Sequence, residues 1–185
     1  MILIDNYDSF TYNVVQYLKE LGISPQIFEN DKVTIEELKQ IKFDKIIISP
    51  GAGNPDTAGI SMNVIKEFYK TKKILGICLG HQCIAQFFGS KIIKSETPTH
   101  GKTSKIIVDN NSTLFKNLPK EFNVTRYHSL IVQDLPKDLK LTAKTNDNII
   151  MAFEHKNLPL YGVQFHPEAI LTEYGYELLE NFITL

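Results

Sequence analysis

The amino-acid sequence predicts an α/β fold in three layers, an open and mostly parallel (mixed) sheet with helices on both faces. Three observations lead to this prediction. In the first half of the chain, short apolar runs alternate with segments of helical spacing. The apolar runs are nearly continuous, as in parallel strands that are covered on both faces. In the second half, strand-like runs follow one another with little helix between them, which favours an antiparallel extension.

The first half divides into segments with recognisable ends. The helical pattern within residues 5–22 stops at a glycine, and Thr34 with Glu37 forms the sequence pattern of a capping box that opens the next helix. Residues 51–59 contain three glycines and are expected to form a loop. The predicted elements are strand 1–4, a turn and helix in 5–22, strand 24–30, helix 35–41, strand 44–50, helix 60–70, strand 72–78 and helix 81–89.

The second half is predicted to consist mainly of strands. Turn-like joints with the sequences NNS, NDN and KNLP separate its apolar runs, and the segment 173–185 has the spacing of a closing helix. No linker, repeat or low-complexity run interrupts the chain, so one domain over 1–185 is expected. The predicted strands are 104–109, 122–128, 139–145, 149–155 and 160–166.

The composition excludes several classes of protein. The formal net charge is −1 and there is no lysine-arginine run, which argues against a nucleic-acid partner. No run of about 18 apolar residues and no signal-peptide core is present, so a membrane partner is not expected. The two cysteines lie too close together in the sequence for a useful structural disulfide. We therefore expect a cytoplasmic protein with reduced thiols.

The run ILGICLGHQC ends a predicted buried strand and places Cys78 between Gly76 and Gly80. This pattern is typical of a nucleophile elbow, a sharp strand-to-helix turn with a strained central residue, in which side chains two positions away would collide. The helix N-terminus favours the thiolate, and the N–H of Leu79 is expected to face a developing oxyanion. The pattern predicts a nucleophile, whereas Cys83 is interpreted as a buried filler.

A thiolate nucleophile needs a group that takes and returns a proton, and His166 is the best placed of the five histidines. It ends a predicted buried strand, and Glu168 follows after Pro167, which stiffens the connection. A carboxylate in this position can fix the tautomer of the imidazole and stabilise its charged form. By contrast, Glu154 and His155 are expected to lie in a solvated turn.

Two further patterns carry weaker signals. Cys78 and His81 have a C-x-x-H spacing that zinc ligands use, but a helix that begins near residue 80 would point Cys83 away, so no metal is expected. The glycine-rich loop that starts at Gly51 is not a P-loop, because no Gly-Lys-Ser/Thr follows. Such a loop could supply a second N–H group to an oxyanion.

Together these segments resemble the class I (triad-type) glutamine amidotransferases, in particular the glutaminase subunits of anthranilate synthase and of aminodeoxychorismate (para-aminobenzoate) synthase. The resemblance covers essentially the whole chain, through IDNYDSFTYN, SPGAGNPDTAGIS, LGICLGHQ, HGKTS, TRYHSL and GVQFHPEAILTEYG. It implies a flavodoxin-like amidotransferase fold, with Cys78 as nucleophile, His166 as general base and acid, and Glu168 as the orienting carboxylate. The residues that it implies for glutamine and the oxyanion hole are Gly51, Ala52, Gly53, Leu79, Gln82, Ser129 and Leu130.

The resemblance also implies a reaction and a partner. L-Glutamine would be hydrolysed through a Cys78 thioester, without a cofactor in this subunit, and the ammonia would pass to a chorismate-binding synthase subunit (component I). Component II of anthranilate synthase is favoured, while component II of para-aminobenzoate synthase and a subunit shared by both remain open. Ala52 departs from the proline usual in this subgroup, which would loosen the loop. Two other interpretations stay open: a stand-alone cysteine hydrolase or γ-glutamyl peptidase, and a non-catalytic binding module.

Overall fold

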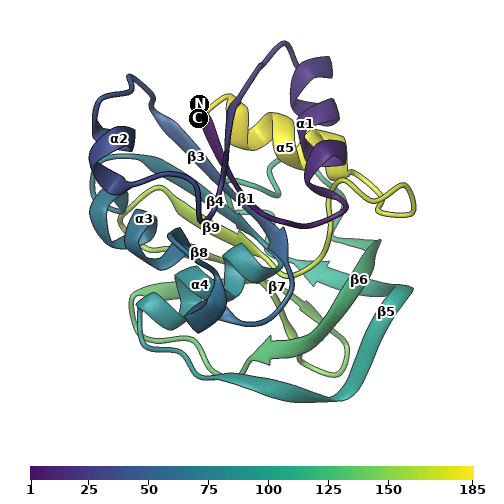
Figure 1. Ribbon diagram of the computed structural model, residues 1–185. Coiled ribbons are helices and arrows are strands. Elements are labelled where there is room, and N and C mark those ends of the chain that lie inside the picture. The colour runs from purple at the N-terminus through teal and green to yellow at the C-terminus, as the bar shows by residue number, and fades with distance from the viewer.

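The computed structural model describes residues 1–185 and confirms a mixed α/β sheet covered by helices on both faces (Figure 1). The nine strands form one sheet in the order β2-β1-β3-β4-β9-β8-β7-β5-β6. In this order, the neighbours among β2, β1, β3, β4 and β9 pair in parallel, and the neighbours among β9, β8, β7, β5 and β6 pair antiparallel. The antiparallel part of the sheet is therefore as large as the parallel part. The elements are β1 (Ile2–Asn6), α1 (Thr11–Glu20), β2 (Gln26–Glu29), α2 (Ile35–Lys39), β3 (Lys45–Gly51), the 3₁₀ helix η1 (Pro55–Thr57), α3 (Ser61–Phe68), β4 (Lys73–Ile77), α4 (Leu79–Phe87), β5 (Ile92–Val108), β6 (Glu121–Val132), β7 (Leu139–Thr145), β8 (Ile150–His155), β9 (Leu160–Val163) and α5 (Gly175–Ile183).

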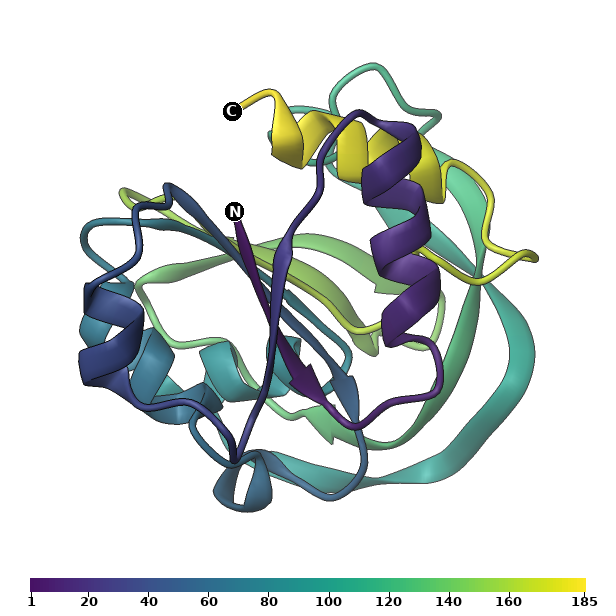
Figure 2. The same ribbon diagram turned by 45° about the horizontal axis from the view of Figure 1, so that its top comes forward.

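Successive side chains of the parallel strands point into two different cores. Ile2 and Ile4 of β1 pack with α2, α3 and α4, whereas Leu3 between them packs with α1 and α5. Because strand side chains alternate, a strand buried on both faces must be apolar throughout, which is why these strands are recognisable in the sequence. Figures 1 and 2 show the two helix layers on opposite sides of the sheet.

The predicted end of α1 and the predicted start of α2 are also confirmed, whereas α4 begins at Leu79, two residues before the predicted start. The Thr34 side chain accepts a hydrogen bond from the Glu37 N–H at 3.2 Å, and the Glu37 carboxylate accepts from the Thr34 N–H at 2.8 Å. Gly22 follows α1 with a φ of 80°, in the left-handed region that favours glycine. These local signals set the ends of α1 and α2 without help from distant residues.

The long strand β5 differs from the predicted strand 104–109, because it begins at Ile92. Its first part is polar and exposed in most positions, and its register against β6 shifts twice, between Lys94 and Thr99 and between His100 and Lys102. We call β5 and β6 together the ribbon, which curves away from the parallel strands (Figure 2). A strand exposed on both sides carries no alternating apolar pattern, so the sequence could not mark its start.

The expectation of a solvated turn at Glu154 and His155 is wrong. Both residues belong to β8, and the Glu154 side chain is only 14% exposed. Its carboxylate accepts a hydrogen bond from the Ser112 hydroxyl at 3.0 Å and lies 3.7 Å from the Lys140 amine. These partners are distant in sequence and compensate for the burial of the charge.

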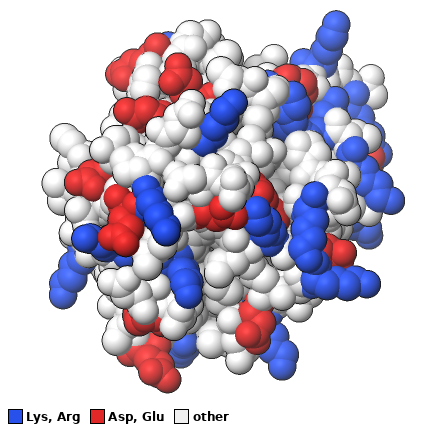
Figure 3. Space-filling view, turned by 180° about the vertical axis from the view of Figure 1, so that it is seen from behind, with Lys and Arg blue, Asp and Glu red and all other residues white.

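The surface shows no single dominant charge on the face in Figure 3, where acidic and basic side chains are interspersed with uncharged ones. None of the helices is long and apolar enough to cross a bilayer.

Candidate active site

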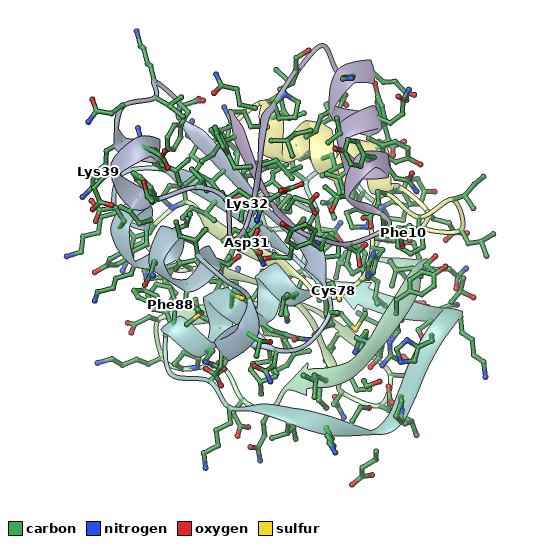
Figure 4. The ribbon with its side chains drawn as sticks, viewed as in Figure 1. Phe10, Asp31, Lys32, Lys39, Cys78 and Phe88 are labelled. Atoms are coloured by element: carbon green, nitrogen blue, oxygen red, sulfur yellow. The ribbon has the colours of Figure 1, made fainter.

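The predicted reactive residues meet where the parallel strands end. Cys78 directly follows β4, His166 comes shortly after β9, and the 51–53 loop begins at the end of β3. The carboxyl ends of parallel strands lie at one edge of a sheet, which is where sites form in folds of this kind. Figure 4 shows Cys78 at the start of α4, with Phe10 on the segment that leads into α1.

Cys78 occupies a sharp turn between β4 and α4, with a φ of 52° and a ψ of −98°. Only tight packing sustains such a conformation in a residue other than glycine. The neighbouring glycines allow that packing: a Cβ atom on Gly76 would lie 2.3 Å from the Gly80 carbonyl, and one on Gly80 would lie 2.3 Å from the Ile48 carbonyl oxygen. The structure thus has the backbone geometry of a nucleophile elbow at Cys78.

The loop after β3 lies next to the elbow. A Cβ atom on Gly51 would approach the Leu79 side chain to 2.9 Å, so the main chain of the loop packs closely against this side chain. The Asn6 side chain holds the loop in place. Its Nδ2–H donates to the Ser49 carbonyl at 3.0 Å, and its Oδ1 accepts from the Ser61 hydroxyl at 2.9 Å. Sequence reasoning did not single out Asn6. Ala52 and Gly53 of this loop are exposed, and Gly53 has a φ of 82°.

His166 and Glu168 form a buried pair. The Nδ1 atom of His166 lies 2.6 Å from Oε1 of Glu168, and both side chains are at most 1% exposed. Burial lowers the pKa of His166, but the Cys78 sulfur and the Glu168 carboxylate outweigh it and raise this pKa to about 10. Because Glu168 accepts from Nδ1–H, Nε2 is the nitrogen left to exchange a proton. Apart from the interaction of His166 with the Cys78 sulfur, that buried Nε2 atom has no hydrogen-bond partner in the protein.

Aromatic rings and the ribbon hold the imidazole in place. The rings of Phe10 and Tyr127 contact the His166 ring edge-on, with centroids at 5.4 and 5.2 Å. The main chain of His166 is fixed too, since its N–H donates to the Thr125 carbonyl at 3.1 Å and its carbonyl accepts from the Thr172 hydroxyl at 2.7 Å. Sequence reasoning missed these supporting residues, because their roles depend on contacts far apart in the chain.

The residues implied for glutamine binding lie on α4 and β6. The Gln82 amide donates to the Leu130 carbonyl at 3.1 Å, which brings these two predicted residues together. Ser129 is exposed, and its hydroxyl lies 2.8 Å from Nε2 of His100. These contacts join the first turns of α4 to the TRYHSL segment.

A buried cation supports the same segment. Arg126 is 4% exposed, and its Nε–H donates to Nε2 of His128 at 3.0 Å. That bond places the imidazole proton on Nδ1, which then donates to the Leu130 carbonyl at 3.0 Å. Burial, followed by the charge of Arg126, lowers the pKa of His128 to about 3, so this histidine stays neutral.

The remaining thiol and histidine near the elbow are buried among apolar groups. Cys83 is 0% exposed, and burial raises the pKa of its thiol to about 12, as expected of a filler. His81 is also 0% exposed and lies against the Phe153 ring at 4.6 Å, and burial lowers its pKa to about 3. No group of three or more His, Cys, Asp or Glu side chains is arranged to hold a metal ion.

Access to the sulfur is narrow. Cys78 is 6% exposed, and none of the five cavities of the molecule is lined by it. A cavity of about 300 Å³ is lined by Phe10 and Tyr127, which contact the imidazole, and by Glu168 and neighbouring residues. Cys78 is therefore nearly buried, although the elbow places it at the edge of the sheet.

An elbow cysteine beside a buried histidine–carboxylate pair is the arrangement of enzymes with a cysteine nucleophile, hydrolases and amidotransferases among them, and the comparisons identify the class. The chain matches the class-I glutamine amidotransferase family over residues 2–185 and belongs to that family. It is similar to aminodeoxychorismate/anthranilate synthase component 2 of Bacillus subtilis (strain 168), with 50% identity over 99% of this chain and 95% of that protein. Anthranilate synthase component 2 of Pyropia yezoensis is 52% identical over 99% of this chain and 98% of its own. A solved structure of a candidate GMP synthase subunit from Thermoplasma acidophilum has a TM-score of 0.87 and 34% identity, and the match covers 100% of this chain and 93% of that one.

Proposed function

We propose that this chain is the glutamine-hydrolysing component of a chorismate-using synthase and that Cys78, His166 and Glu168 carry the reaction. The observation that supports this most directly is the elbow at Cys78 beside a histidine whose Nδ1 is 2.6 Å from a buried carboxylate. In a family of glutamine amidotransferases, that arrangement suits attack on a side-chain amide.

The proposed reaction has two stages. The Cys78 thiolate adds to the amide carbon of glutamine, and the N–H groups of Leu79 and the 51–53 loop stabilise the oxyanion. The His166 imidazolium gives its proton to the leaving nitrogen, so ammonia departs and a thioester remains. His166 then takes a proton from water, which attacks the thioester, and glutamate leaves as the sulfur becomes a thiolate again. No cofactor is needed, because these side chains supply the nucleophile and the proton transfers.

The proposed partner is a component I subunit that binds chorismate and uses the ammonia. The names of the two component 2 relatives support this partner, and one of them names both aminodeoxychorismate and anthranilate synthase. We favour anthranilate synthase, with the para-aminobenzoate enzyme or a shared subunit as the alternative product route. The two free thiols support a reducing compartment such as the cytoplasm.

We further propose that docking of the partner opens the site. The low exposure of Cys78, 6%, supports this, since a movement of the surrounding segments would widen the approach of glutamine to the sulfur. The docking surface would include the 51–59 loop and the exposed HGKTS part of β5. An uncoupled glutaminase would waste glutamine, which is a functional reason for such control.

Purified chain tests the proposal when it is assayed with glutamine, with and without chorismate and a component I subunit. We expect slow glutamate release alone, faster release with the partner, and either anthranilate or 4-amino-4-deoxychorismate as product. The Cys78→Ala variant is expected to release no glutamate under any condition. Equal rates with and without the partner would refute the control by docking, and full activity of Cys78→Ala would refute the assigned nucleophile.

A further inference from the structure

Gln164 is a buried polar residue that the proposed mechanism does not yet use. It follows β9 directly, two positions before His166, and is 0% exposed. Its main-chain N–H donates to the Met151 carbonyl at 2.8 Å, which fixes where the side chain starts. A fully buried amide is unfavourable unless its oxygen and its N–H groups find partners. The identity of those partners therefore indicates what this side chain does.

Two contacts satisfy the Gln164 amide. Its Oε1 accepts from Nε2 of Gln82 at 3.0 Å, and its own Nε2 lies 3.6 Å from the Cys78 sulfur. This is the one side-chain hydrogen bond to that sulfur besides its interaction with His166. The amide thus bridges the nucleophile and a residue implied in glutamine binding.

The direction of these bonds is fixed by the Leu130 carbonyl, which can only accept. The Gln82 group that points at this carbonyl must be its NH₂, and the same NH₂ then donates to Gln164. Gln164 must consequently turn its oxygen toward Gln82 and its NH₂ toward Cys78. His128 also donates to the Leu130 carbonyl, so both acceptor positions of that oxygen are used.

We infer that Gln164 is a further catalytic residue, which donates an N–H to the Cys78 sulfur and stabilises its ionised form. The inference deepens the proposed function, because it concerns the same nucleophile. Hydrogen bonds to a charged acceptor are about twice as strong as neutral ones. The sulfur carries charge before attack and again when the thioester breaks, and at both moments the Gln164 N–H is already in place. Through its hydrogen bond with Gln82, the same amide also fixes the position of the sulfur relative to the segment that is proposed to bind glutamine.

Alkylation of Cys78 by iodoacetamide measures the effect on the sulfur without requiring glutamine or a partner. We expect Gln164→Leu, which removes the donor, to raise the midpoint of the pH–rate profile by about one unit and to slow alkylation about tenfold below that midpoint. Gln164→Met serves as a second variant of similar length. Gln26→Leu on the exposed edge strand β2 is the matched control and should leave the profile unchanged. Mass spectrometry distinguishes Cys78 from the buried Cys83.

A purely structural role predicts a different result: a lower melting temperature with an unmoved midpoint. Folded Gln164→Leu or Gln164→Met protein whose midpoint stays within about 0.3 units of the wild type would overturn the inference. If neither variant folds, the wild-type protein is titrated by NMR instead. The resonance of the Gln164 side-chain N–H must then shift over the same pH range in which the alkylation rate of Cys78 passes its midpoint. A resonance that does not respond overturns the inference as well. Wild-type protein that shows the predicted alkylation profile but never hydrolyses glutamine with a partner would instead refute the proposed function alone.

Discussion

Replacing Gly80 by alanine tests whether packing of α4 on β3 positions the nucleophile. The added Cβ atom would lie 2.3 Å from the Ile48 carbonyl oxygen, whereas ordinary contacts begin at 3.4 Å. The two backbones must therefore separate by about 1 Å, and Cys78 moves with the helix that it precedes. A shift of about 1 Å at a reacting group reduces the rate about 100-fold. Overpacking of this kind also lowers the free energy of unfolding by about 1–3 kcal/mol.

The assay combines urea unfolding with glutamine hydrolysis in the presence of a synthase subunit. Gly22→Ala is the matched control, since its φ is +80° and an added Cβ atom would meet nothing within 4 Å. Its strain should lower stability by about 1–2 kcal/mol without moving the elbow, so activity should persist. The reasoning fails if Gly80→Ala keeps activity within about threefold of the wild type, or if Gly22→Ala loses as much activity.

Three further predictions concern the His166–Glu168 pair, the charge of His166 and the helix cap at Thr34. Glu168→Gln should lower kcat by about 1000-fold or more with little change in KM, because the orienting carboxylate is lost; steady-state kinetics with unchanged kcat would contradict this. Cys78→Ala should lower the pKa of His166 from about 10, measured by NMR titration, since the sulfur raises it. In the wild type, the protonation of His166 stabilises the fold fully below pH 6.5, and this stabilisation is lost as the pH rises through about 10. A free energy of unfolding in urea that stays constant over this pH range would contradict the prediction. Thr34→Ala should reduce the unfolding free energy by about 1 kcal/mol at unchanged activity, and equal urea midpoints would argue against the capping box.

The parallel half of the fold could be predicted because its signals are local. Strands β1, β3 and β4 are buried on both faces, so their apolar runs stand out, and the glycines around Cys78 mark the elbow. The start of β5 could not be predicted, since the polar residues before Ser104 form a strand only by pairing with β6. Glu154 was misinterpreted because its partners lie more than ten positions away.

Within the site, sequence motifs identified the groups that carry charge but not those that support them. Cys78 and His166 belong to short patterns with a chemical meaning. The orientation of the Gln164 amide depends instead on a carbonyl at Leu130 and on a second amide on α4. Phe10 is another such residue, because its contact with the imidazole exists only once the chain has folded. Supporting residues of this kind follow from three-dimensional neighbours, which one sequence does not list.

The Cys78 sulfur and the His166 imidazole, the two groups proposed to react, are attached to different parts of the structure. The sulfur is fixed by the tightly packed junction of β3, β4 and α4, whereas the imidazole is also clamped by Thr125 and Tyr127 of the curved ribbon. A force applied to the outer strands therefore reaches the base directly, whereas it reaches the nucleophile only through the Gln82 and Gln164 amides that connect Leu130 to Cys78. Bending of those strands would therefore change the distance over which the proton travels.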